Sequence, residues 1–434
     1  MSGGLLFRGG RLLDPRHGVD GVRDVRVQDG RVAAVAPSLT VPPGAEVVDA
    51  SGLWVLPGLV DLHVHLREPG EEGKETILTG SRAAVAGGFT TVVAMPNTRP
   101  VNDAPGVTAF VLQRAREAGL CRVLPAGAIT RGLKGEELTD FGALQAAGCV
   151  CITDDGRPVM SAGIMRRALQ WSCQFGLPVM VHEEDLTLSA GGVMTEGLRA
   201  SRLGLRGIPA SAEVAMVARD LVMLEEVQRA RLHVAHVSCE ASVRLIREAR
   251  RRGLPVTAEV APHHFSLTDA AVEGYDTHAR MNPPLRLDRD VAALREGLAD
   301  GTLDAVATDH APHGVLDKQV EFSRAMNGVV GLETALPLTL ALARQGTLPL
   351  LRAVEVLTAG PARCFGLPAG HLGVGAAADV TLVDPDERWT VDAAAFESKS
   401  RNTPFQGMEM TGRVVQTWVE GRRVFARARK GRQG

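Results

Sequence analysis

Strand-like and helix-like stretches alternate through the middle of the chain. Short apolar runs, typical of buried strands, are followed by segments in which apolar residues recur every three or four positions, as they do on one face of a helix. The clearest helical segments are Glu75–Ala86, Ser161–Phe175, Ala212–Ala230 and Ala241–Arg252. The predicted strands are Leu59–Leu66, Phe89–Pro96, Cys121–Ala128, Gly148–Asp154, Leu177–Glu184, Arg231–Ser238, Val256–Phe265 and Ala305–Pro312.

Eight strands that alternate with helices over about 300 residues predict an α/β fold, a (β/α)8 TIM barrel. A doubly wound open sheet is the alternative, but such a sheet would not need eight units. We place the barrel at residues 56–365.

The two ends of the chain have a different pattern. They contain short alternating runs separated by Gly, Pro and Asp-Gly turns, which is typical of antiparallel strands. Neither set is long enough to bury two sheet faces alone. We therefore predict one small β-sandwich domain built from residues 1–55 and 366–434 together. Its expected strands are Gly21–Gln28, Arg31–Ala36, Glu46–Asp49, Ala378–Val383 and the hairpin Arg413–Phe425.

The composition excludes several classes of partner. Lys and Arg number 48 against 50 Asp and Glu, the net charge is −2, and no segment concentrates basic residues, which argues against nucleic acid or an anionic membrane. No apolar stretch approaches the ~20 residues of a membrane helix, and the N-terminus lacks a signal-peptide pattern. The 6 cysteines lie mostly in apolar surroundings, as reduced core thiols do. We expect a cytoplasmic protein that acts on a small molecule.

Histidines and carboxylates collect where the predicted strands end, and in a barrel the active site lies at those ends. His63 and His65 are two apart on the first strand, so both would face the same side and could bind one metal ion through neutral imidazoles. The other candidates at strand ends are Asp61, Arg67, Asp154, Asp155, His182, His236, Asp309 and His313.

Several neighbouring residues keep more than one interpretation. His233 and His236 are three apart on one predicted strand and would face opposite sides, and we favour His236 as the ligand because it is nearer the end of the strand. His263 and His264 would likewise be split between faces, and we assign both to structural or supporting roles. Three acids would either orient ligand imidazoles or be solvated: Asp61, Glu183 and Glu184.

The scarcity of lysine bears on how two metal ions would be bridged. Histidine together with carboxylate favours zinc over cobalt or manganese, and a pair of ions needs a bridging anion. Many hydrolytic barrels use a carbamylated lysine on the fourth strand, but none of the five lysines falls on any predicted strand. The bridge would then pass to a carboxylate, and Asp155 is available. The lysines are Lys74, Lys134, Lys318, Lys399 and Lys430.

Seven sequence strings, in order along almost the whole chain, carry a family resemblance. The chain resembles the class I dihydroorotases, the longer bacterial type, within the amidohydrolase superfamily. The strings are Pro57-Gly-Leu-Val-Asp-Leu-His-Val-His-Leu-Arg-Glu-Pro-Gly70, Ala94-Met-Pro-Asn-Thr98, Thr153-Asp-Asp-Gly156, His233-Val-Ala-His-Val-Ser238, Met281-Asn-Pro-Pro284, Ala307-Thr-Asp-His-Ala-Pro-His313 and Gly331-Leu-Glu-Thr334.

The resemblance implies two zinc ions per subunit and a role for each matching residue. His63 and His65 would hold the first ion with Asp309 completing its ligands, and His182 and His236 would hold the second. Asp155 and a hydroxide would bridge both ions, with Asp154 as the alternative to Asp155. Substrate would be held by Arg67, Asn97, Asn282, His313 and the backbone around Asn327 and Gly328, where Asn327 replaces a more usual aromatic residue.

The activity that the resemblance implies is the reversible cyclisation of N-carbamoyl-L-aspartate to L-dihydroorotate in de novo pyrimidine biosynthesis. Arg67 shares the inward face of His65 and could bind a substrate carboxylate through two parallel hydrogen bonds. Asp309 would take a proton from the attacking hydroxide and return it to the leaving nitrogen. The segment Gly314–Asn327 has no strong helix or strand signal and would form a lid.

Two other functions compete with this interpretation. Dihydropyrimidinases, hydantoinases and allantoinases share the barrel and bind metal ions in a similar way. They usually carry the modified lysine, however, and lack a carboxylate-binding residue such as Arg67. A non-catalytic homologue would serve as a scaffold for aspartate transcarbamoylase, but such proteins have usually lost metal ligands. A homodimer is the family expectation, and an active enzyme could still associate with aspartate transcarbamoylase.

Overall fold

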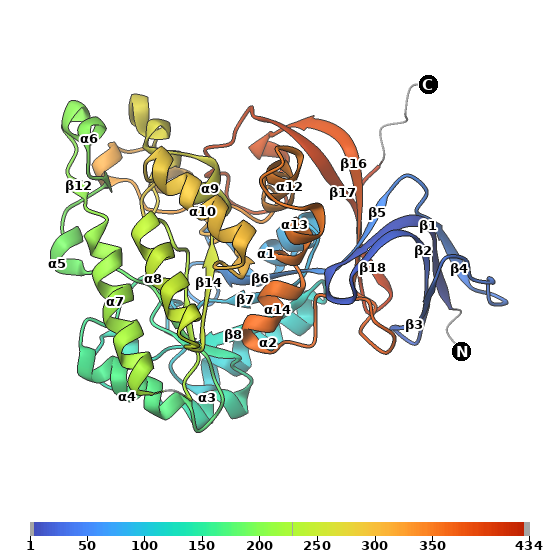
Figure 1. Ribbon diagram of the computed structural model, residues 1–434, viewed down its shortest axis with the longest axis horizontal. Coiled ribbons are helices and arrows are strands. Elements are labelled where there is room, and N and C mark those ends of the chain that lie inside the picture. The colour runs from blue at the N-terminus through green and yellow to red at the C-terminus, as the bar shows by residue number, and fades with distance from the viewer. Residues whose placement is uncertain (1–3, 228, 429–434) are drawn as a thin grey trace.

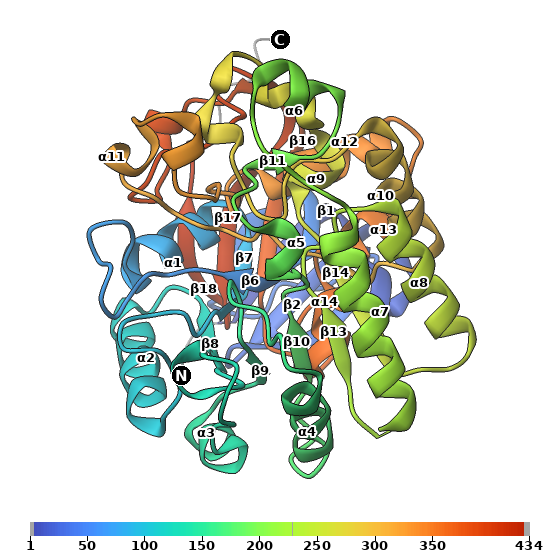
Figure 2. The ribbon, with the colours of Figure 1, turned by 90° about the vertical axis from the view of Figure 1, so that its left-hand side faces the viewer.

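The computed structural model describes residues 4–227 and 229–428 of the chain. Figure 1 shows a large α/β body with a smaller β-sheet region at one side, and the two described ends of the chain lie close to that smaller region. In Figure 2 helices surround the central strands of the large body on all sides. The predicted α/β fold is therefore confirmed.

Eight parallel strands form the barrel, with the sheet order β15-β14-β13-β10-β9-β8-β7-β6, and the short strands β11 (Met194–Thr195) and β12 (Gly207–Ile208) pair with each other outside it. A parallel bridge between Val64 and His310 joins the first strand to the last, and the His65 N–H donates to the His310 carbonyl at 2.8 Å. Each barrel strand lies within its predicted range. The strands are β6 (Leu59–Val64), β7 (Phe89–Ala94), β8 (Arg122–Gly127), β9 (Cys151–Thr153), β10 (Val179–Val181), β13 (Leu232–Val234), β14 (Val256–Val260) and β15 (Ala305–Val306).

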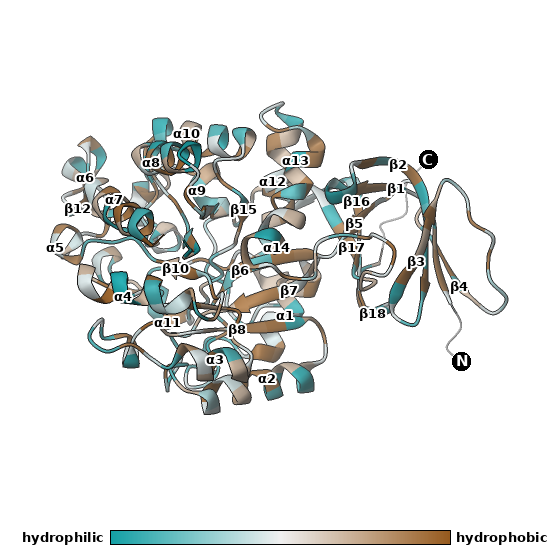
Figure 3. Ribbon diagram, turned by 60° about the horizontal axis from the view of Figure 1, so that its bottom comes forward, coloured by the Kyte–Doolittle hydropathy of each residue, from teal (hydrophilic) through white to brown (hydrophobic). Residues whose placement is uncertain are grey.

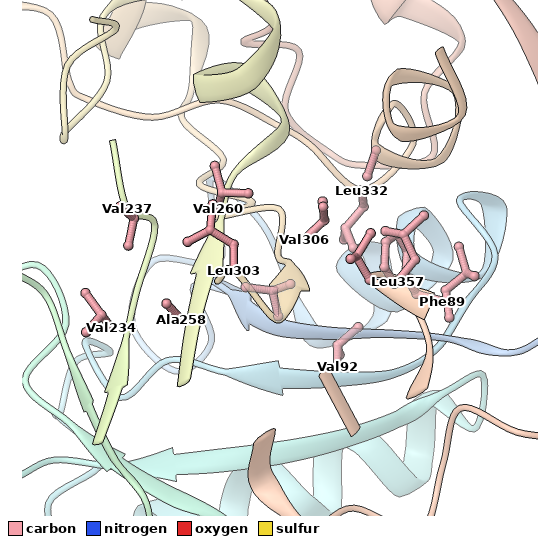
Figure 4. Packing of buried hydrophobic residues seen from close by; sticks show 14 of the residues in the cluster. Phe89, Val92, Val234, Val237, Ala258, Val260, Leu303, Val306, Leu332 and Leu357 are labelled. Atoms are coloured by element: carbon pink, nitrogen blue, oxygen red, sulfur yellow. The ribbon is translucent and has the colours of Figure 1, made fainter. Parts of the chain in front are cut away.

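The helices between these strands bury their apolar faces against the outside of the barrel. Figure 3 shows brown apolar strands inside a layer of helices with teal outer faces, and Figure 4 shows Phe89, Val92, Val234 and Leu357 packed in the main core. The principal helices are α1 (Ile77–Ala86), α2 (Pro105–Ala118), α3 (Phe141–Ala147), α4 (Ala162–Ser172), α7 (Ser211–Glu226), α8 (Glu240–Arg251), α10 (Asp288–Asp300), α12 (Ala335–Arg344), α13 (Leu350–Glu355) and α14 (Ala359–Phe365).

Capping residues explain where several helices begin. The Thr76 side chain accepts a hydrogen bond from the Thr79 N–H, and the Ser161 hydroxyl accepts one from Ile164. Such side chains satisfy N–H groups that a helix leaves without an internal partner. The four predicted helices are present with slightly different ends. Gln228, within the predicted range Ala212–Ala230, lies outside the described residues.

One predicted strand was wrong in its second half. The range Val256–Phe265 holds β14 only as far as Val260, and Pro262 then begins the short helix α9 (Pro262–Ser266). Proline at the first helical position needs no backbone N–H and already has a helical φ angle, so it starts a helix readily. His263 and His264 therefore lie on a helix and not on alternating faces of a strand.

The predicted small β domain from both termini is confirmed as one hydrogen-bonded sheet. Its order is β18-β17-β16-β5-β1-β2-β3, with β4 paired to β1. The apolar cluster of this sheet includes Phe7, Val25, Leu382 and Trp418, which come from opposite ends of the chain. The strands are β1 (Leu5–Asp14), β2 (Val19–Gln28), β3 (Arg31–Ala36), β4 (Glu46–Asp49), β5 (Trp54–Pro57), β16 (Val380–Thr390), β17 (Glu409–Val419) and β18 (Arg422–Ala426).

The C-terminal part of the predicted small domain also reaches the barrel. Ser398 donates a hydrogen bond to Glu75, and Asn402 donates to the carbonyls of Ala311 and Gly328 at 3.0 Å each. Residues 398–402 thus contact the barrel although they fall within the predicted domain 366–434. The outermost parts of the two predicted ranges, residues 1–3 and 429–434 with Lys430, lie outside the described residues.

Among the helices of the described residues, none is both long and apolar enough to cross a membrane.

Candidate active site

The β6 pair, His63 and His65, presents its two Nε2 atoms to the same point. The Nδ1 atom of His63 donates to Glu259 Oε1 at 3.0 Å, and that of His65 donates to Asn97 Oδ1 at 2.9 Å. A donor at Nδ1 leaves the Nε2 lone pair of a neutral imidazole free. The Nε2 atom of His63 is buried and has no hydrogen-bond partner among the described residues, as expected of an atom that binds a metal ion.

Asp155 lies at the centre of all four candidate histidines. Its Oδ1 is 3.2 Å from His63 Nε2, 3.6 Å from His182 Nδ1 and 3.7 Å from His236 Nε2, and its Oδ2 is 3.4 Å from His65 Nε2. Two buried groups that could hold a metal ion share this one residue, which is the geometry of a bridging carboxylate. Burial would raise the pKa of Asp155, but the surrounding histidines, His63 first, hold it well below its usual value.

His182 and His236 form a second pair, here called the split pair because its members come from two strands: His182 follows β10 and His236 follows β13. Its ring nitrogens, His182 Nδ1 and His236 Nε2, are 2.9 Å apart. His182 Nε2 lies 3.3 Å from Glu184 Oε2 and donates to it, so the lone pair of neutral His182 is at Nδ1, which faces His236 and Asp155. The Nδ1 atom of His236 is buried without a partner among the described residues.

Asp309 stands beside the β6 pair. Its Oδ1 is 3.2 Å from His65 Nε2 and 3.7 Å from His63 Nε2. Burial would raise the pKa of Asp309, but its contacts with His65 and His63 lower it below its ordinary value, so the carboxylate is ionised.

Backbone strain gathers at this site. Arg67, His236 and Asp309 have φ angles of 59°, 34° and 46°. Positive φ is uncommon for residues other than glycine and persists where the surrounding structure enforces it, often at functional sites. The strain at His236 also corrects an expectation, because β13 ends at Val234 and the strand alternation does not reach His236. His236 contacts His182 and Asp155, and His233 Nε2 lies 3.1 Å from Glu259 Oε2, so both histidines contact residues of the site.

Glu259 is the supporting residue that sequence analysis missed. Its two carboxylate oxygens accept hydrogen bonds from His63 and His233, and it is buried on β14. Burial would raise the pKa of Glu259, but these hydrogen bonds lower it to about 2. The available signal was a single acid within the apolar strand β14, since carboxylates are almost never buried without a partner.

The other candidate acids divide between the site and the scaffold. Asp154 is turned away from the histidines, because its carboxylate accepts hydrogen bonds from the backbone and side chain of Thr130. Asp61 accepts from the Thr308 hydroxyl at 2.6 Å and so ties β6 to the end of β15. Glu183 is buried, with Asp220 and Arg219 as its nearest charges. Of the three acids that sequence left open, Glu184 alone contacts a ligand imidazole in the described structure.

Two sets of candidate metal ligands, His63–His65–Asp155 and Asp155–His182–His236, are called the metal-ligand groups below. A cavity of about 390 Å³ opens over them. Its wall includes every residue expected to bind substrate, together with Arg280, which the sequence did not indicate, and Arg324, Ala325 and Met326 of the predicted lid. The expected substrate residues on this wall are Arg67, Asn97, Asn282, His313, Asn327 and Gly328.

Arg67 and His313 lie together on one side of the cavity. Arg67 Nε donates to the Pro312 carbonyl at 3.2 Å, and its Nη2 is 3.4 Å from His313 Nε2. Burial and then the charge of Arg67 lower the pKa of His313 to about 2, so the ring is neutral. Its Nε2–H donates to the Asn327 carbonyl at 2.7 Å. In this arrangement Arg67 is the group that can bind a carboxylate. The His313 N–H instead holds the Asn327 carbonyl in place.

Asn97 and Asn282 each contact a carboxylate of the site. Asn97 Nδ2 is 3.4 Å from Asp155 Oδ2 while its Oδ1 accepts from His65. Asn282 Nδ2 donates to Glu184 Oε2 at 2.8 Å. Asn97 therefore contacts two candidate metal ligands directly, whereas Asn282 reaches His182 only through Glu184, and both asparagines line the cavity.

The expected lid, Gly314–Asn327, contains the short helix α11 (Val315–Lys318) and the turn Phe322–Arg324. Its end and Gly328 form the wall segment, residues 324–328, on the outer side of the cavity. Gly328 has a φ of 136°, and a Cβ atom there would come within 2.8 Å of the Ala311 carbonyl oxygen. Only glycine fits this approach without moving the backbone.

Comparisons with known proteins assign the chain to a family. A model of dihydro-orotase-like proteins matches residues 52–242, and a model of the amidohydrolase family matches residues 275–425. A dihydroorotase from Anaeromyxobacter sp. (strain K) is 60% identical over 426 residues, which covers 98% of each protein. A dihydroorotase from Syntrophotalea carbinolica is 56% identical over 421 residues, 97% of this chain and 99% of that protein.

Solved structures with the same fold are similar over almost the whole chain. An L-hydantoinase (dihydropyrimidinase) from Arthrobacter aurescens has a TM-score of 0.88 and 29% identity, and the match covers 99% of this chain and 97% of that one. A dihydropyrimidinase from Brevibacillus agri has a TM-score of 0.83 at 24% identity, covering 98% and 95%, which supports the fold alone.

Proposed function

Because the chain belongs to the dihydroorotase family of amidohydrolases, we propose that it catalyses the reversible cyclisation of N-carbamoyl-L-aspartate to L-dihydroorotate in pyrimidine biosynthesis. The observation that carries the proposal is the arrangement of the cavity. Two buried groups of candidate metal ligands share Asp155, and Arg67 lines the same cavity. A cyclic amide with one carboxylate needs both features, the first for hydrolysis and the second for binding.

We propose zinc as the metal, with two ions per subunit. His63, His65 and Asp309 would hold one ion, His182 and His236 the other, and Asp155 both. The fit rests on the donor set and on the buried Nε2 atom of His63, which has no hydrogen-bond partner among the described residues. Such ions, when bound, polarise a carbonyl group and lower the pKa of water.

Arg67 and Asp309 have separate tasks in the proposed mechanism. Arg67 binds the carboxylate that the substrate keeps in both directions of the reaction, and so places the amide over the metal-ligand groups. Asp309 accepts the proton of the attacking hydroxide during ring opening and delivers it to the leaving nitrogen. In ring closure it removes a proton from the carbamoyl nitrogen, which forms a bond to the side-chain carboxyl carbon, and it passes that proton to the carboxyl oxygen that leaves as hydroxide.

An assay of the purified protein with L-dihydroorotate, dihydrouracil and allantoin tests the function, together with a metal count by elemental analysis. Turnover of dihydroorotate alone is the expected result. Dihydrouracil and allantoin have no carboxylate for Arg67 to bind, so their turnover without that of dihydroorotate would overturn the proposal in favour of a hydantoinase-like activity.

Replacing Asp309 by Asn tests the proton transfer. Asparagine keeps the shape and an oxygen ligand but cannot accept a proton, so we expect turnover to fall by at least about 10²-fold while most of the metal is retained. Activity and metal content are measured on the same preparation. An Asp309→Asn variant with near-normal kcat would refute the assignment.

We also propose a homodimer in the cytoplasm, on the strength of the family alone. Association with aspartate transcarbamoylase is tested by co-purification of the two enzymes, and the mass of the native particle tests the dimer.

A further inference from the structure

Lys318 is the one buried lysine in the described part of the chain, with 3% of its surface exposed. It ends helix α11, outside the metal-ligand groups. Its ammonium donates to the carbonyls of Met326, Thr277 and Arg280 at 2.6, 3.0 and 3.2 Å. All three donor hydrogens of the ammonium are thus used, and every acceptor is a main-chain oxygen.

Burying a charged ammonium group against main-chain carbonyls alone costs folding free energy. A buried charge needs compensation, and neutral carbonyls compensate less than a carboxylate would. Burial and then the charge of Arg280 lower the pKa of Lys318 to about 7. A buried lysine that stabilises a loop in this way must be holding particular backbone atoms in place.

The three carbonyls belong to two segments that meet at the cavity. Thr277 and Arg280 precede Asn282, and Met326 belongs to the wall segment. A second link runs the other way, because the Thr277 hydroxyl donates to the Lys318 carbonyl at 2.6 Å. Lys318 therefore joins the loop that carries Asn282 to the wall that carries Asn327.

Arg280 extends the same joint toward the cavity. Its Nε donates to Asn327 Oδ1 at 3.0 Å, and its carbonyl accepts the Gly328 N–H at 3.0 Å. The Asn327 carbonyl in turn accepts from His313, which lies against Arg67. A displacement of the wall segment would therefore change the position of the Arg67 guanidinium, which binds the substrate carboxylate.

We propose that Lys318 is a positioning residue: its ammonium fixes the wall segment against the Asn282 loop so that the cavity presents Arg67 and the Asn327–Gly328 backbone in binding geometry. The proposal rests on the proposed function for its substrate. It concerns binding of the substrate, not the metal ions or proton transfer.

The test replaces Lys318 by Met, which keeps the length of the side chain and removes all three donors. We expect KM for L-dihydroorotate and for N-carbamoyl-L-aspartate to rise by about tenfold, with a smaller change in kcat and unchanged metal content. Lys318→Arg, which keeps the charge and donors, should recover part of the loss. Lys134→Met, at an exposed lysine, is the matched control and should leave KM unchanged.

A second measurement follows the wall itself. Arg324 is an exposed residue of the wall segment, and an arginine-specific protease should cut after it faster in Lys318→Met than in the unchanged protein. Saturating substrate should restore part of the protection. If Lys318→Met does not fold, Thr277→Val removes only the Thr277–Lys318 hydrogen bond and should raise KM in the same direction by a smaller factor.

Unchanged KM and unchanged cleavage after Arg324 in Lys318→Met would overturn the proposal. So would a lower melting temperature with unchanged KM, since a purely stabilising residue would produce that result. Failure of the proposed function is distinguishable, because the unchanged protein would then not turn over dihydroorotate, while cleavage after Arg324 would still report whether Lys318 holds the wall.

Discussion

The β6 pair and the split pair provide the same chemical groups but hold them in different ways. His63 and His65 come from one strand, both use Nε2, and each donates from Nδ1 to a fixed acceptor, Glu259 or Asn97. His182 and His236 follow different strands and face each other through Nδ1 and Nε2, and Glu184 is the acceptor described for the pair.

The difference predicts how firmly each pair is organised before metal binds. Orientation of a ligand imidazole by a hydrogen bond at its other nitrogen fixes the tautomer and increases the basicity of the ligand. Glu259 is fully buried, whereas the side chain of Glu184 is 14% exposed, so water can replace part of its role. The β6 pair should therefore bind its ion more tightly than the split pair.

The largest effect should come from Asp155, which both pairs share. Replacing it by Asn removes the one negative charge that faces four imidazoles, and breaking a buried charge pair costs about 3–5 kcal/mol, or about 10²–10⁴-fold. We expect loss of metal from both pairs and loss of turnover, measured by elemental analysis and assay.

Asp154→Asn is the matched control for that experiment. Asp154 is adjacent in sequence but bonds Thr130, so its replacement should lower stability and spare the metal content. Retention of both ions by Asp155→Asn, or their loss from Asp154→Asn, would contradict the assignment of the shared ligand.

A smaller effect is expected from Glu259→Gln. A neutral amide cannot accept strongly from both His63 and His233, so affinity of the β6 pair for zinc should fall by about 10–100-fold while the split pair changes little. Competition with a chelator measures both affinities. Glu183→Gln, at a buried acid near Arg219, is the control, and an equal effect there would show that the loss is not specific to Glu259.

Glu184→Gln should have the smallest effect, at most about tenfold on the affinity of the split pair. Its contact with His182 is 3.3 Å long, and the side chain is partly exposed. The same chelator titration gives the answer. A loss larger than that of Glu259→Gln would reverse the proposed order of the two pairs.

Some residues of the site could be predicted from the local sequence pattern, and others could not. The i, i+2 spacing of His63 and His65 needed no tertiary information, because strand geometry alone puts both on one face. The absence of lysine from the fourth strand directed attention to Asp155, which lies among all four histidines. His236 was selected by its nearness to a strand end, although the strand stops at Val234 and a positive φ turns the histidine inward.

The sequence by itself determined the alternation of strands and helices, the small domain shared by both termini and the ligand types at the strand ends, since these follow from local periodicity and residue chemistry. Only the tertiary structure decided that Glu259 holds His63, a residue 196 positions away, and that Lys318 joins two loops. Such contacts depend on how the barrel closes and how its loops pack, which sets distances between residues that no local pattern relates.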